Sequence, residues 1–203
     1  FGANGDAGLA WLNTTVATCA AMLGWLLVEQ LRDKHVTSLG AASGVVAGLV
    51  AVTPAAGNLT PVTAIILGAI GGALSAVGAG LKYRFKFDDS LDVVGVHLVA
   101  GLWGTVGIGL LATDDGLLTG GGGDGFKLFV VQIVIAVVAL VYTAVVTAVI
   151  GLILKKTMGW RISGDDEVAG IDSALHAETA YSRDGDLTAL EAEQDAAGAA
   201  AKG

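Results

Sequence analysis

A single histidine interrupts a long apolar run near the middle of the sequence. The run from Leu91 to Thr113 is long enough to cross a bilayer, and His97 lies about a third of the way along it. Three carboxylates, those of Asp88, Asp89 and Asp92, crowd the start of the run. Eight residues separate Asp89 from His97, so a helix would place the imidazole about 12 Å deeper than the carboxylate. An ionisable side chain at that depth is a candidate functional residue.

The chemistry open to His97 is limited by its surroundings. Burial in lipid disfavours the charged ring, and a neutral imidazole carries one donor and one acceptor nitrogen. Such a ring can pass a proton or line a path for a small polar molecule. The alternative is a packing role, in which the ring hydrogen-bonds to a neighbouring helix. With no second histidine in an apolar run and Cys19 as the only thiol, the sequence predicts no metal site and no cofactor.

The composition is that of a membrane protein. Of the 203 residues 54% are hydrophobic and only 15% are charged, against about 25% in soluble domains. Five apolar runs predict membrane-spanning helices, and the second is short for a full span. They cover residues 9–31, 38–53, 61–81, 91–112 and 126–154. We therefore predict an all-α polytopic helical bundle. The sequence offers no nucleophile–base pair and no phosphate-binding loop, so an enzyme is not expected.

The charges between the runs alternate. Basic side chains occur in residues 32–37, in residues 82–88 and after the fifth run. The two connections between them differ: residues 54–60 carry no charge, and the only charged residues of 113–125 are acidic. By the positive-inside rule, residues 1–8 are then extracellular and the C-terminus is cytoplasmic. Most of the net charge of −8 lies in the tail and gives no sign of a nucleic-acid partner. The tail is expected to be a cytoplasmic regulatory segment over 155–181 and a disordered acidic one over 182–203.

Small residues recur every four positions in three of the runs. Close helix packing in lipid is the preferred interpretation for the second and third runs, whose rows are Gly40, Gly44, Gly48 and Gly68, Gly72, Ala76, Gly80. In the fourth run the row also contains the imidazole, with space in front of it. Its members are Val93, His97, Gly101, Thr105 and Gly109.

Four stretches resemble the later helices and the tail of the ammonium transporter (Amt/Mep/Rh) family. They are "LNTTVATCAAMLGW" (12–25), "LGAASGVVAGLVAVTPAAG" (39–57), "DDSLDVVGVHLVAGLWG" (88–104) and "ISGDDEVAGIDSALHAETAY" (162–181). The resemblance implies half of an inverted-repeat channel fold, helices seven to eleven. The half with the first pore histidine and the external gate is missing, and we expect an N-terminal part to precede Phe1.

The resemblance also implies roles for individual residues. His97 and Val93 would line the pore, and Ser43 and Asp92 would lie at its cytoplasmic vestibule. The remaining assignments are the helix cap Asp89, the structural Thr53, and the tail contacts Gly170 and Asp172 with a neighbouring subunit.

The implied function is transport of ammonium or ammonia across the plasma membrane through a histidine-lined hydrophobic pore. An ammonium sensor or scaffold that signals through its tail is the alternative, and an unrelated bundle in which His97 only packs is a third. The implied partners are membrane lipid, two further copies in a homotrimer and a PII-type signal protein.

Overall fold

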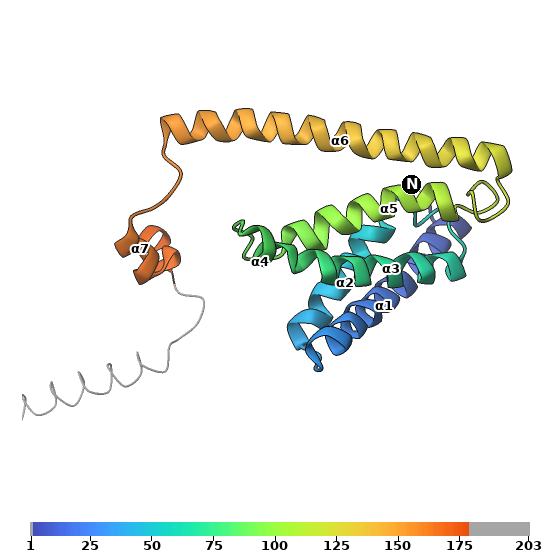
Figure 1. Ribbon diagram of the computed structural model, residues 1–203, viewed down its shortest axis with the longest axis horizontal. Coiled ribbons are helices and arrows are strands. Elements are labelled where there is room, and N and C mark those ends of the chain that lie inside the picture. The colour runs from blue at the N-terminus through green and yellow to red at the C-terminus, as the bar shows by residue number, and fades with distance from the viewer. Residues whose placement is uncertain (1, 179–203) are drawn as a thin grey trace, which may run out of the picture. The chain divides into compact units, whose positions relative to one another are not determined.

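The computed structural model describes residues 2–178, and every regular element within them is a helix or a helical turn (Figure 1). The predicted disordered tail over 182–203 lies outside the described residues. The chain divides into two units, residues 1–145 and 146–203. The elements are α1 (Gly5–Asp33), α2 (Ser38–Val52), α3 (Pro61–Ala79), α4 (Leu81–Phe85), η1 (Val94–Val99), α5 (Ala100–Leu111), α6 (Gly122–Thr157), α7 (Gly164–Ala169) and η2 (Asp172–His176).

Side-chain caps set where the first three helices begin. The side chains of Asn4, Thr37 and Thr60 accept hydrogen bonds from backbone N–H groups in the first turns of α1, α2 and α3. Each of these caps has extended backbone, which is the usual geometry of an N-cap residue. The cap at Asn4 starts α1 four residues before the predicted Leu9, since polar residues can extend a helix beyond its apolar run.

Four helical segments of the described chain are long and apolar enough to cross a membrane. They are Gly5–Asp33, Pro61–Phe85, Val94–Leu111 and Gly122–Thr157. All five predicted runs are helical, but α2 has 15 residues and is therefore roughly 22 Å long, shorter than a bilayer core of about 30 Å. After α2, Thr53 and Pro54 lead into the connection to α3, and the Thr53 hydroxyl donates to the Leu49 carbonyl at 2.6 Å.

The small-residue rows are where the helix backbones meet. A methyl group at Gly68 or Gly72 of α3 would collide with the backbone carbonyl of Ala17 or Ala21 in α1. Gly44 of α2 likewise faces the Trp25 side chain and the α1 backbone beside it. The packing interpretation of these rows is thus confirmed. α1 lies against both α3 and α2.

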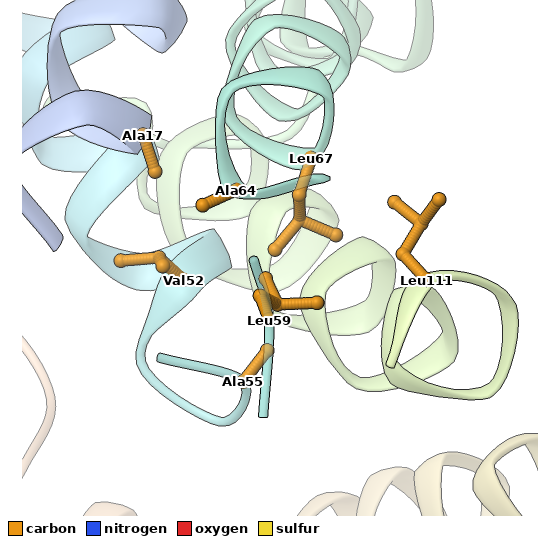
Figure 2. Close-up of a cluster of buried hydrophobic side chains, with 7 residues drawn as sticks. All are labelled: Ala17, Val52, Ala55, Leu59, Ala64, Leu67 and Leu111. Atoms are coloured by element: carbon orange, nitrogen blue, oxygen red, sulfur yellow. The ribbon is translucent and has the colours of Figure 1, made fainter. Parts of the chain in front are cut away.

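An apolar cluster closes the end of the bundle that contains the α2–α3 connection (Figure 2). Leu59 of that connection lies between Ala55 and Leu67, and it is 1% exposed. Asn13 of α1 holds the connection in place, because its amide donates to the carbonyls of Ala56 (2.8 Å) and Leu59 (2.7 Å). The other members of the cluster are Ala17, Val52, Ala64 and Leu111.

Up to residue 178, the second unit contains the end of α6 and two short elements, α7 and η2. Ser163 caps α7 by accepting a hydrogen bond from the N–H of Asp166 at 3.1 Å. The helix ends at Gly170, whose φ of 96° lies in the region that favours glycine. The apolar side chains of this segment are exposed: Val168, Ile171 and Leu175.

Candidate functional site

The carboxylate of Asp89 caps the helix that carries His97. It accepts hydrogen bonds from the backbone N–H groups of Val93 at 2.8 Å and Val94 at 2.9 Å. These N–H groups begin the helix and have no partner within it, so the carboxylate both satisfies them and complements the helix dipole. Asp92, in the turn before the helix, has a φ of 56°, a conformation that aspartate tolerates better than most residues.

His97 lies in a π-helical turn, η1, which continues directly into α5. A π turn is wider than an α turn, and such turns are frequent at functional sites. The turn lies very close to α3, where a methyl group on Gly95 would collide with the backbone of Ala79. A methyl group on Gly78 would in turn meet the side chain of Val99. The contact fixes one face of η1 against α3 and leaves the His97 ring exposed on another.

The exposed imidazole borders a cavity of about 260 Å³, open on one side. Three members of the predicted row, His97, Gly101 and Thr105, line this cavity. Val93 is half exposed and is not among the lining residues, and Gly109 instead lies against the α6 backbone at Phe129. The rest of the lining is apolar apart from one hydroxyl: Leu98, Leu102, Ala136, Ala139, Leu140 and Thr143.

A second pocket of about 430 Å³ lies at the end of the bundle where α1 stops and α2 begins. We call it the charged pocket. Ser43 from α2 and Asp92 from the turn before η1 both line it, so the structure brings these two predicted residues together. Asp92 precedes His97 by five residues, or roughly 7 Å along a helix axis. The charged side chains of the lining are Glu29, Arg32, Asp33, Lys82 and Asp92.

Glu29 is a nearly buried carboxylate in the wall of the charged pocket, with 8% of its surface exposed. It accepts hydrogen bonds from the Trp25 indole at 3.1 Å and from the Thr37 backbone N–H at 2.9 Å. The Thr37 hydroxyl, 3.1 Å from the same carboxylate, also accepts from the N–H of Gly40 as the α2 cap. Glu29 therefore joins the end of α1 to the beginning of α2.

Lys82 forms a further polar contact of the charged pocket. Its ammonium group lies 2.8 Å from an Asp92 carboxylate oxygen and donates to the Asp89 carbonyl at 3.1 Å. Sequence reasoning identified neither Glu29 nor Lys82 as a site residue. The only signal was their position at the ends of apolar runs, and nothing in the sequence pairs positions 82 and 92. Within residues 2–178 no group of His, Cys, Asp and Glu side chains could hold a metal ion.

Comparison with known proteins gives a consistent result. The model of the Ammonium Transporter Family matches residues 1–181. An ammonium transporter of Mycobacterium tuberculosis is 48% identical over 191 residues, and one of Bacillus subtilis is 41% identical over 184 residues. The alignments cover 88% of this chain but only 39% and 45% of those relatives. The chain thus spans about two fifths of the length of the curated relatives it matches.

Solved structures agree with the family match. A protein described as "Sensor Amt Protein" superposes with a TM-score of 0.77 at 28% identity, over 85% of this chain and 42% of that one. Mep2 of Saccharomyces cerevisiae gives a TM-score of 0.69 at 29% identity, over 79% of this chain and 38% of that one. Both the sequence and the all-helical fold place this chain in the ammonium transporter family, as part of a multi-pass membrane protein.

Proposed function

We propose that the protein containing this chain moves ammonium or ammonia across the plasma membrane through an apolar pore lined by His97. The observation that carries the proposal is the exposed imidazole beside a cavity whose other walls are mostly apolar. The relatives that match this chain are named ammonium transporters, which supports the same substrate.

The lining determines which species can pass. Moving a bare ammonium ion into an apolar lumen costs several kcal/mol or more, because the ion loses its water shell without gaining charged partners. Separating the proton leaves ammonia, which is neutral and can donate to or accept from an imidazole nitrogen. His97 would then either hydrogen-bond to the passing ammonia or transfer the proton released by ammonium. Val93, one turn earlier and outside this cavity, would line the path next to it.

The rest of the pore would come from the part of the protein outside this chain. His97 is exposed, and its cavity is open on one side, as expected for a surface that another half of the protein covers. The charged pocket, with Ser43 and Asp92, would form the cytoplasmic vestibule. The basic residues at this end of the bundle support that orientation by the positive-inside rule, with the C-terminus in the cytoplasm.

Uptake of labelled methylammonium by the full-length protein in vesicles tests the proposal. We expect His97→Ala to abolish uptake or its selectivity for ammonium-like substrates. The matched control is His35→Ala, because His35 is exposed and lies between α1 and α2 outside the apolar runs. Wild-type rate and selectivity in the His97→Ala protein would exclude a pore role for the imidazole.

A second function, signalling through the tail, is favoured by the exposed apolar side chains of α7 and η2. Val168, Ile171 and Leu175 present apolar surface on a short segment rich in acidic residues. Gly170 and Asp172 would then contact a neighbouring subunit of a homotrimer, and the segment would bind a PII-type signal protein. Deleting residues 161–181 should abolish binding of a purified PII-type protein and leave methylammonium uptake intact. Unchanged binding after the deletion would exclude this role for the tail.

A further inference from the structure

Lys82 and Asp92 form an ion pair that is largely shielded from solvent. The two charged groups are 2.8 Å apart, and their side chains are 17% and 24% exposed. The pair joins the short helix α4 to the turn that precedes η1. At this exposure the charges interact more strongly than a fully solvated surface pair, whose contribution is usually below about 1 kcal/mol.

The other charged groups around the pocket already have partners. The Glu29 carboxylate is held by Trp25 and Thr37, as described above. Arg32 donates to the Asp33 carboxylate and, at 3.2 Å, to the Ala76 carbonyl. Of the carboxylates that line the charged pocket, Asp92 is the one that depends on Lys82 for a cationic partner.

We propose that Lys82 is a specificity-determining residue of the vestibule, because its ammonium group occupies the cation position beside Asp92. This inference rests on the proposed transport function. A carboxylate in a partly buried pocket attracts small monovalent cations, and a bound cation at the mouth would obstruct the ammonia path. With Lys82 in place the Asp92 carboxylate belongs to a neutral pair, so Asp92 does not retain ammonium or another cation.

Lys82 also has a structural contact, which the test must separate from its charge. The bond from Lys82 to the Asp89 carbonyl supports the turn that positions the helix cap. Losing this bond would lower uptake in every salt to the same extent. Losing the charge would instead make uptake depend on which cation is present, and only this dependence measures the proposed role.

The experiment compares methylammonium uptake in vesicles that hold the full-length protein, in potassium chloride or in N-methylglucamine chloride. The same salt is present on both sides, so the orientation of the protein does not matter. We expect methylammonium uptake by Lys82→Ala to be about three- to tenfold slower in potassium than in N-methylglucamine. The reason is that the Asp92 carboxylate, without its lysine partner, would attract potassium but not the much larger organic cation. Wild type, Lys82→Arg and the double variant Lys82→Ala/Asp92→Asn should show no such difference.

Two further variants make the result decisive. Lys82→Gln keeps a donor for the Asp89 carbonyl, so it should fold even where Lys82→Ala does not, and it should show the same potassium sensitivity. Arg84→Ala is the matched control, because Arg84 is an exposed basic residue of the same helix that does not line the pocket.

Either of two results would overturn the proposal. One is a potassium-insensitive Lys82→Gln protein, and the other is a double variant as sensitive as Lys82→Ala. A wild-type protein that takes up no methylammonium in either salt would count against the transport function itself, which keeps the two failures distinct.

Discussion

Replacing Glu29 by alanine should destabilise the bundle more than the loss of any other single carboxylate described above. The change removes the acceptor for three donors: the Trp25 indole, the Thr37 N–H and the Thr37 hydroxyl. A buried donor left without an acceptor costs roughly 1–3 kcal/mol. Because these groups border a pocket, water can replace part of what is lost. We therefore expect the free energy of unfolding to fall by about 3 kcal/mol, which is less than the summed cost of three unsatisfied donors.

Thermal unfolding of the full-length protein in detergent measures this loss. A destabilisation of about 3 kcal/mol lowers the Tm of a 150–250-residue domain by roughly 6–12 °C, and of a longer protein by less. Asp33→Ala is the matched control, since Asp33 lies four residues later in α1 and pairs with Arg32 in an exposed position. Its loss should cost at most about 1 kcal/mol. Equal Tm values for the two variants would refute the reasoning.

A double-mutant cycle with Thr37 tests whether the effect runs through the contact. Glu29 and Thr37 share hydrogen bonds. The double variant Glu29→Ala/Thr37→Ala should therefore lose less free energy of unfolding than the sum of the losses of the two single variants. Thr37→Ser keeps the hydroxyl and should remain close to wild type. Strict additivity would mean that the carboxylate stabilises the protein by some other contact.

Two further predictions concern the helix packing and the cap. Asp89→Ala should lower the free energy of unfolding by about 1 kcal/mol, the usual loss for an N-cap, and a circular dichroism melt compared with that of the wild-type protein would detect it. Gly72→Ala should destabilise the bundle by about 1–3 kcal/mol, because the new methyl group meets the Ala21 carbonyl. Gly8→Ala should instead stabilise α1 by up to about 1 kcal/mol, because the space around Gly8 is open and alanine favours the helix. Unfolding of the two glycine variants in the same detergent checks the opposite signs.

Much of the fold could be predicted from local properties of the sequence. Apolar length gave the positions of the helices within a few residues, because the bilayer requires a minimum run whatever the partners are. The glycine rows gave the helix contacts, since close approach of backbones needs small residues on one face. The carboxylate at Asp89 marked a helix start because its partners, the N–H groups of Val93 and Val94, are near in sequence.

The rest depends on contacts between residues that are far apart in the chain. Lys82 could be interpreted only as a basic residue between two spans, because its pairing with Asp92 requires the path taken by α4. The row through His97 assumed 3.6 residues per turn, and the π turn changes that spacing. His97, Gly101 and Thr105 share a cavity, whereas Val93, which precedes the π turn, does not line it.

The contact between Glu29 and Gly40 has an evolutionary consequence. A methyl group at position 40 would overlap the Glu29 carboxylate, which is already held in place by Trp25 and Thr37. The two positions therefore cannot drift independently. Either order of change passes through a less stable intermediate. Alanine at position 40 first overlaps the carboxylate, and a shorter side chain at position 29 first leaves the Trp25 and Thr37 donors without their acceptor. Only the second order opens the space that the methyl group needs, so the two positions are expected to change together.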